Sequence, residues 1–235
     1  MTTLKTIQSE LRSIADPATA ITSQGFFKTA PGQYGEGDIF LGIKVPALRA
    51  LVRSFRNTPL DIIAGLLKSK FHEERLFALL LLIDFYQHGD DTDKQCAYEL
   101  YLASTAHINN WDLVDASAYF IVGDFLITRP RQPLYQLVVS GSLWERRIAI
   151  ISTFCFIRRN DFTDTLLIAK QLLADDHDLI HKAAGWMLRE VGKRDLPTAE
   201  AFLKRYYRTM PRTMLRYAIE RFPEARRKQY LNGTV

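Results

Sequence analysis

The segment 110–115 (NWDLVD) holds the residue pair with the clearest potential for chemistry. Trp111 and Asp115 are spaced i and i+4, so in a helix they project from one face, one turn apart. An indole beside a carboxylate attracts a cation, because the ring supplies a π face and the carboxylate a full charge. Asp112 lies near the expected helix start, where it can act as a cap. Core packing of Trp111 and an ion pair from Asp115 to the next repeat would explain the same spacing.

The segment 143–147 (LWERR) places two adjacent arginines near a second helix start. Arg146 and Arg147 suit contacts to phosphates, and they equally suit ion pairs between repeats. Neighbouring residues are about 100° apart around a helix, so we expect only one of the two to face a groove.

The segment 183–190 (AAGWMLRE) pairs a glycine with the third tryptophan. Gly185 inside a helix costs about 1 kcal/mol relative to alanine, which indicates close packing or the approach of a ligand. Trp186 is a candidate stacking surface for a sugar or a base. A large core residue beside a small one would give the same pattern.

Other polar clusters have simpler explanations. His177 and His181 are spaced i and i+4 among carboxylates, but Leu179 breaks the zinc-protease pattern and capping explains the acids, so no metal is expected. Residues 72–74 (HEE) are interpreted as a solvated helix start. The stretch 32–37 (GQYGEG) follows no strand, which argues against a dinucleotide loop. The sequence contains no phosphate loop, nucleophile elbow or cysteine-based zinc pattern, and no cofactor is expected.

The elements that must position these residues are helices. Alternation of apolar and polar residues is nearly absent, whereas helical periodicity is widespread. Ile7, Leu11 and Ile14 open a first helix that is expected to stop near Asp16 and Pro17. The glycine-rich segment 23–38 is predicted to be a loop insertion.

Helix starts recur with a period of about 35 residues. Six positions share this spacing: Phe40, Arg75, Trp111, Arg146, His181 and Arg216. Second amphipathic helices are predicted between them, at residues 94–104, 133–139, 164–173 and 198–207. Two helices per repeat predict an all-α solenoid of about six HEAT-like repeats, a single domain over residues 1–235 that curves around a concave face with repeated polar anchors.

The charge distribution favours a polyanionic partner. The net charge is +5, and residues 204–228, predicted as a basic C-terminal repeat, hold nine basic and two acidic residues. Lys182, Arg212 and Arg216 join the two central arginines as candidate phosphate contacts, although a solvated basic helix face is the alternative. No apolar run reaches membrane-spanning length, and Cys96 and Cys155 fit a reducing compartment, so a cytoplasmic, nucleoid-associated monomer is expected.

Several segments in order resemble the AlkD family of bacterial DNA alkylation-repair glycosylases, which are built on HEAT-like repeats. The resemblance runs along most of the chain and is carried by residues 40–49, 111–115 with 122–124, 144–147, 185–190 and 210–219. It implies excision of N3- and N7-alkylated purines that carry a positive charge, from double-stranded DNA. It also implies catalysis without a metal and without flipping the base into a pocket, unlike most base-modifying enzymes.

The resemblance also implies roles for individual residues. Trp111 and Trp186 would hold the deoxyribose of the lesion, Asp115 would be the catalytic carboxylate, and Arg147 would contact the backbone near the lesion. The family also uses an aromatic residue near the second helix, where Phe26 or Phe27 stands.

Two other functions fit the sequence. A non-catalytic relative that binds distorted or branched DNA would keep the basic face without needing Asp115. A HEAT-repeat scaffold for a protein partner would present apolar hot spots in place of arginine and tryptophan.

Overall fold

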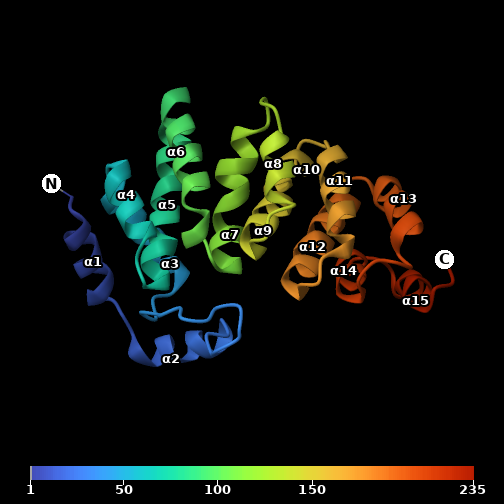
Figure 1. Ribbon diagram of the computed structural model, residues 1–235, viewed down its shortest axis with the longest axis horizontal. Coiled ribbons are helices and arrows are strands. Elements are labelled where there is room, and N and C mark those ends of the chain that lie inside the picture. Colours follow the sequence, from blue (N-terminus) through green and yellow to red (C-terminus); the bar gives the residue numbers. More distant parts are fainter. Residues whose placement is uncertain (1) are drawn as a thin grey trace. The chain divides into compact units, whose positions relative to one another are not determined.

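The computed structural model describes residues 2–235, and its regular elements are helices (Figure 1). Within the described residues, the only β pairing is an isolated bridge between Ile39 and Phe71. The chain divides into two compact units, which meet in sequence between Ser117 and Ala118. Each unit has its own set of packed helices, and the single domain over residues 1–235 stays a prediction.

The first unit contains α1 (Leu4–Ser13), α2 (Pro17–Phe26), α3 (Val45–Val52), α4 (Leu60–Leu67), α5 (His72–His88), α6 (Asp91–Ala103) and nearly all of α7 (Trp111–Ala118). At its centre lies α5, which packs against α3, α4 and α6. Its side chains from Leu76 to Ile83 are all buried, as expected for a helix that is apolar on every side.

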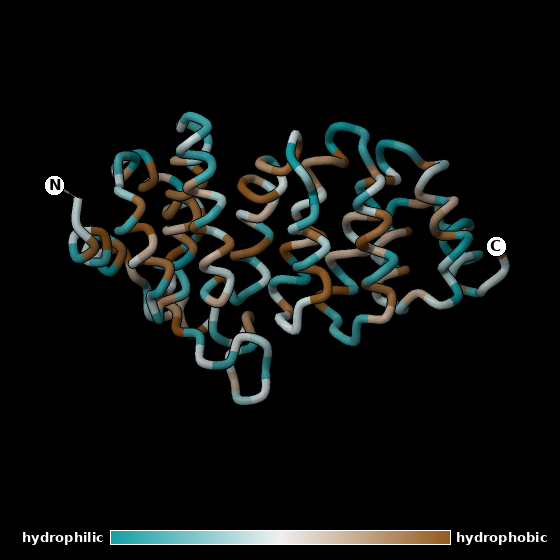
Figure 2. The backbone as a smooth tube through the Cα atoms, turned by 45° about the horizontal axis from the view of Figure 1, so that its top comes forward, coloured by the Kyte–Doolittle hydropathy of each residue, from teal (hydrophilic) through white to brown (hydrophobic). Residues whose placement is uncertain are grey.

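The second unit begins at the end of α7, where the helix continues as a π-helical turn (Tyr119–Gly123). It then contains α8 (Gln132–Leu137), α9 (Leu143–Ser152), α10 (Phe154–Ile157), α11 (Thr163–Gln171), α12 (Asp178–Arg194), α13 (Leu196–Tyr206), α14 (Arg212–Ala218) and α15 (Glu224–Asn232). The long helix α12 packs against α9, α13 and α14 and buries Ile180, Met187 and Leu188. Figure 2 shows hydrophilic residues at many of the turns that join the helices.

The helical repeat pattern is confirmed by this element order. Helices begin close to five of the six predicted registers, and Phe40 lies just before α3, as predicted. The intervening helices α6, α8, α11 and α13 coincide with the predicted second helices within a few residues.

The N-terminal region agrees with the prediction at the first helix and differs from it at the second. The first helix ends at Ser13, close to the predicted stop near Asp16 and Pro17. Asp16 caps the next helix, because its carboxylate accepts a hydrogen bond from the Ala18 N–H and Pro17 occupies the first helical position. The helix that follows extends to Phe26, so the irregular segment begins at Phe27 and not at Ser23. Helical residues 23–26 were missed because a glycine lies among them.

Candidate functional site

Trp111 lies at the start of α7, where three aromatic rings meet. The Asn110 side chain caps this helix, since its Oδ1 accepts a hydrogen bond from the Trp111 N–H at 2.8 Å. Phe27 stacks on Trp111 with the ring centroids 5.4 Å apart, and Phe26 meets it edge-on at 6.0 Å. Phe26 is 64% exposed, so the cluster has an open aromatic side. Both phenylalanines that the resemblance suggested therefore contact Trp111.

His72 continues this cluster into the interior of the first unit. Phe27 stacks on Phe40 at 4.9 Å, and Phe40 stacks on the His72 imidazole at 4.4 Å. The imidazole lies between two carboxylates, with Nδ1 2.8 Å from Asp38 Oδ2 and Nε2 2.8 Å from Asp112 Oδ2. Asp112 also accepts a hydrogen bond from the Leu113 N–H, so it caps α7 as predicted and holds His72 as well.

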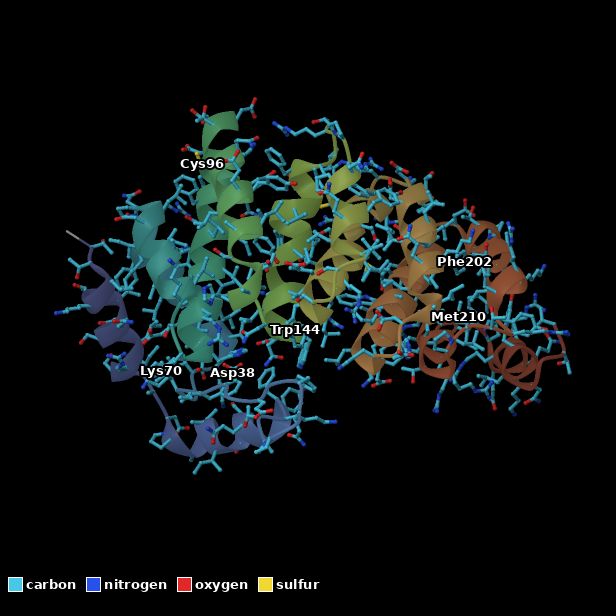
Figure 3. All side chains as sticks on the ribbon, viewed as in Figure 1. Asp38, Lys70, Cys96, Trp144, Phe202 and Met210 are labelled. Atoms are coloured by element: carbon cyan, nitrogen blue, oxygen red, sulfur yellow. The ribbon has the colours of Figure 1, made fainter. Side chains whose placement is uncertain are left out.

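The two carboxylates stabilise the protonated form of His72. Burial opposes the charge, but the hydrogen bonds to Asp112 and Asp38 outweigh this effect and raise the pKa of His72 to about 9. Burial likewise opposes the charge of Asp38, yet His72 and Arg75 together hold the pKa of Asp38 below its usual range. The Arg75 guanidinium donates to Asp38 Oδ1 at 2.5 Å, and Asp38 is labelled in Figure 3.

The prediction that residues 72–74 form a solvated helix start is wrong. His72, Glu73 and Glu74 are all buried. Glu73 accepts hydrogen bonds from the backbone N–H groups of residues 41, 42 and 43 at 2.7–3.1 Å. Glu74 accepts hydrogen bonds from the side chains of Gln8, Arg12 and Ser69. Apart from Ser69, the donors that compensate these acids are distant in sequence.

Asp115 lies one turn after Trp111 on α7, and its side chain is partly buried. Its charge reaches Tyr101, which is fully buried. Burial raises the pKa of Tyr101, a hydrogen bond to Ser117 opposes the rise, and the negative charge of Asp115 adds to it. The carboxylate therefore stands in a partly desolvated setting, where it interacts more strongly with a cation than it would in water.

Trp186 is the corresponding aromatic residue of the second unit. Its indole is partly exposed, and its Nε1–H donates to Glu190 Oε1 at 3.1 Å. Phe154 lies 6.3 Å from it, centroid to centroid. Gly185 packs against α14, because a Cβ there would lie 2.5 Å from the Met214 carbonyl oxygen. Close packing is therefore the explanation for this glycine.

The two adjacent arginines both take part in contacts within the protein. Arg146 donates to Asp175 Oδ2 at 2.6 Å and to the carbonyl oxygens of Ser140 and Gly141. Arg147 is only 4% exposed and donates to the Leu179 carbonyl at 2.5 Å. Arg146 therefore forms an ion pair with a residue of the following repeat, as in the alternative interpretation, and Arg147 is held by a backbone carbonyl.

The remaining predicted phosphate contacts vary in exposure. Lys182 pairs with Asp178 at 2.6 Å on its own helix, and Arg212 donates to the Leu231 carbonyl at 2.7 Å. Arg216 is exposed on α14. Part of the basic segment 204–228 is neutralised locally, since Lys204 and Arg226 both pair with Glu200.

The two spaced histidines have structural roles. The His177 Nδ1 accepts the Leu179 N–H at the start of α12, and His181 Nε2 lies within hydrogen-bond distance of the Asp175 carbonyl. From residue 2 to residue 235, no group of three or more His, Cys, Asp or Glu side chains is arranged to hold a metal ion. Within the same range, no helix combines the length and apolar character needed to cross a bilayer.

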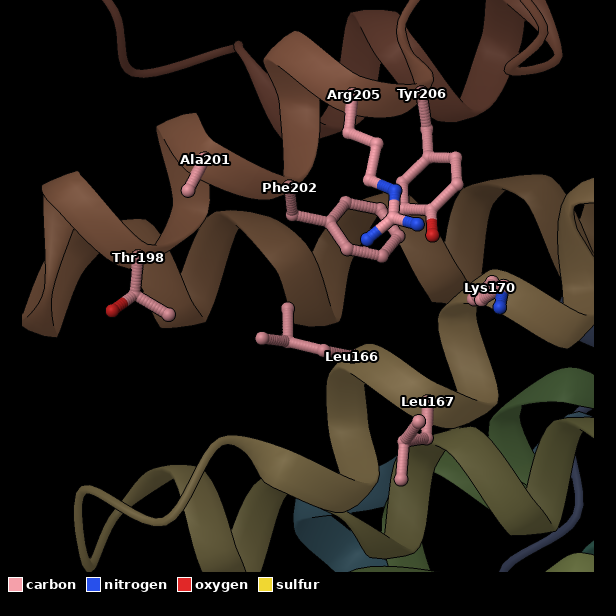
Figure 4. Close-up of a pocket in the computed structure, with 8 residues that line it drawn as sticks. All are labelled: Leu166, Leu167, Lys170, Thr198, Ala201, Phe202, Arg205 and Tyr206. Carbon is pink, nitrogen blue, oxygen red and sulfur yellow. The ribbon is translucent and has the colours of Figure 1, made fainter.

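A pocket of about 400 Å³ lies between α11 and α13 in the second unit. Figure 4 shows Phe202 and Tyr206 on one side of it, with Leu166 and Leu167 opposite. None of the predicted site residues lines this pocket.

The structure thus brings Trp111, Phe26 and Phe27 together in the first unit, with Asp115 one turn along the same helix. Trp186 and Arg147 belong to the second unit. Sequence reasoning missed Asp38 and His72, because Asp38 lies in the irregular segment before α3 and His72 at the start of α5, where polar residues are usually exposed or act as caps.

A family model and a solved structure are similar to this chain. A family model described as DNA alkylation repair enzyme matches residues 7–222. A solved structure described as a predicted DNA alkylation repair enzyme from Enterococcus faecalis is similar to this chain, with a TM-score of 0.68 and 17% sequence identity. The match covers 89% of this chain and 97% of that one, and at this identity it establishes the fold alone. No curated protein matches the sequence.

Proposed function

Because the chain belongs to the DNA alkylation repair enzyme family, we propose that it is a DNA glycosylase. Its substrates are N3- and N7-alkylated purines in duplex DNA, whose alkylated base carries a positive charge. It acts in base excision repair as a cytoplasmic monomer, without a metal and without drawing the base into a pocket. The observation that carries this proposal is the open aromatic cluster of Trp111, Phe26 and Phe27 one helical turn from the carboxylate of Asp115.

The proposed reaction needs no strong general acid. The alkylated purine is already cationic, so the N-glycosidic bond breaks with its electron pair going to the base, which leaves as a neutral molecule. Positive charge then develops on the deoxyribose, as in an oxocarbenium ion. The partly desolvated carboxylate of Asp115 stabilises that charge and orients the water that adds to the sugar carbon.

The aromatic faces supply the second part of the proposed mechanism. Trp111 offers a π face to the cationic sugar, and Phe27 holds the indole ring from behind by stacking. We assign Trp186 of the second unit to a stacking contact with a sugar or base, whereas Arg147 is buried and donates to the Leu179 carbonyl, so it is not assigned to DNA. Arg146, Lys182, Arg212 and Arg216 are assigned to phosphates elsewhere on the duplex.

Release of free 7-methylguanine from methylated duplex DNA tests the activity directly, with spontaneous depurination subtracted. Asp115→Asn keeps the shape and removes the charge, so we expect the barrier to rise by roughly 2–4 kcal/mol, or about 30- to 1000-fold in single-turnover rate. Asp91→Asn, which changes an exposed carboxylate in the same unit, is the matched control. An Asp115→Asn enzyme as fast as the wild type would refute the role of Asp115.

Measurements of DNA binding distinguish the glycosylase from the two alternative functions. Salt-sensitive binding to duplex DNA without base release would favour the non-catalytic DNA-binding relative. Neither binding nor release would favour the protein scaffold.

A further inference from the structure

His72 joins the interior of the first unit to the candidate site by two routes. Through Nε2 it contacts Asp112, the residue directly after Trp111 in the first turn of α7. Through its ring it stacks on Phe40 and lies 5.1 Å from Phe27, which in turn stacks on Trp111. His72 therefore contacts both the helical turn that carries Trp111 and the phenylalanine ring that stacks on the Trp111 indole.

The charges around His72 balance only while the imidazole is protonated. Asp38 and Asp112 face its two nitrogens, and Arg75 neutralises the second oxygen of Asp38. The neighbouring acids do not take part, since Glu73 is directed to backbone N–H groups of the 41–43 loop and Glu74 to α1. A neutral imidazole has one N–H, so one nitrogen lone pair would face a carboxylate oxygen at 2.8 Å.

Asp112 is the partner that such a mismatch would release. Asp38 keeps Arg75 and the Asn110 amide as donors when His72 is neutral. Asp112 keeps the Leu113 N–H, which belongs to its own helix and does not tie α7 to α5. Loss of the proton therefore weakens the side-chain link between α5 and the first turn of α7.

We propose that His72, as an imidazolium, is a positioning residue that fixes the first turn of α7 and the Trp111 indole in the orientation that base excision needs. This inference rests on the proposed glycosylase function for its effect on rate, but its structural part does not. It assigns His72 to orientation of the site and not to contact with DNA, since the side chain is buried.

The first test needs no substrate. The chain has three tryptophans, so Trp144→Phe with Trp186→Phe leaves Trp111 as the only indole. We expect its fluorescence to change between pH 7 and 9.5, since the pKa of His72 is raised to about 9. Asp112→Asn keeps the shape, and by removing one carboxylate it should move the midpoint down by about one to two pH units.

Two histidine variants in this single-tryptophan background complete the test. His72→Gln should abolish the transition, whereas His88→Gln, on the exposed end of the same helix, should leave it unchanged. Fluorescence that is the same in all variants across this pH range would overturn the inference. If His72→Gln does not fold, the midpoint of the fluorescence transition in Asp112→Asn tests the inference instead.

The second test uses the full chain on methylated duplex DNA. We expect His72→Gln to slow single-turnover base release at least tenfold with DNA affinity within about twofold, because misplacement by about 1 Å can cost about 100-fold in rate. As the pH is raised, the rate of base release should begin to fall at a lower pH in Asp112→Asn than in the wild type. Equal rates for His72→Gln and wild type would refute the effect on rate. A wild type that releases no base would refute the proposed function, and the fluorescence midpoints would still decide whether His72 orients Trp111.

Discussion

Replacing Gly185 with alanine should destabilise the second unit, because α14 lies directly against this residue of α12. An added Cβ would lie 2.5 Å from the Met214 carbonyl oxygen and 2.6 Å from Tyr217 Cβ. Ordinary contacts of a Cβ begin at 3.4 Å. One of the two close neighbours is backbone, so a rotamer change cannot relieve the overlap, and the two helices must separate by about 1 Å.

The size of the effect follows from two opposing contributions. Overpacking of a well-packed interface costs typically 1–3 kcal/mol, and this interface includes the buried side chains of Met214, Leu215 and Ala218. Alanine is more favourable than glycine inside a helix by about 1 kcal/mol. We therefore expect the free energy of unfolding to fall by up to about 2 kcal/mol. For a chain of this length, that lowers the melting temperature by up to roughly 8 °C.

Thermal and urea unfolding of Gly185→Ala measure this change. The matched control is Gly25→Ala in α2, where an added Cβ has no atom within 4 Å. That variant should be neutral or more stable by up to about 1 kcal/mol, since only helix propensity changes. The reasoning is refuted if Gly185→Ala is stabilised as much as Gly25→Ala.

Three further outcomes follow from the structure. Glu73→Gln should lower the free energy of unfolding by about 2–4 kcal/mol, because it weakens charge-assisted hydrogen bonds to three buried N–H groups, whereas exposed Glu10→Gln should change it little. The pKa of His72 is raised from 6.5 to about 9, so protonated His72 contributes about 3 kcal/mol to the free energy of unfolding. This contribution is complete below pH 6.5 and is lost as the pH rises to 9. Urea titrations in which wild type and His72→Gln lose stability in parallel over this range would contradict it. Arg216→Ala should weaken DNA binding and reduce the salt slope by about 1, and a slope equal to that of the wild type would remove Arg216 from the interface.

The helices could be predicted because their signals are local. A polar residue before an apolar periodic stretch identifies a helix start, and the starts of α5, α7, α9, α12 and α14 lie within about four residues of the predicted registers. The same local information failed at α2, where Gly25 suggested a loop although the helix continues to Phe26.

The candidate site could be predicted only where it lies on one helix. The spacing of Trp111 and Asp115 placed both on α7 without any tertiary information. The contact of Phe27 with Trp111 joins residues more than eighty positions apart, and no periodicity encodes it. The burial of Arg147 was not predicted either, since an arginine looks the same in sequence whether it faces a phosphate or a carbonyl.

The first turn of α5 explains why those distant residues meet. His72 fixes α7 through Asp112, and the adjacent Glu73 fixes the 41–43 loop through backbone N–H groups. That loop holds the start of α2, since the Asp16 N–H donates to the Leu41 carbonyl at 3.0 Å.

Gly42 in this loop has a φ of +80° and lies so close to α2 that a Cβ there would be 2.0 Å from the Asp16 carbonyl oxygen. The far end of α2 carries Phe26, and Phe27 follows it directly. Two neighbouring side chains of α5 thus position the aromatic cluster. His72 positions Trp111, and Glu73 positions the two phenylalanines. Glu73→Gln should therefore loosen the Phe27–Trp111 contact as well as destabilise the unit, so that its Trp111 fluorescence departs from that of Glu10→Gln while both proteins are still folded.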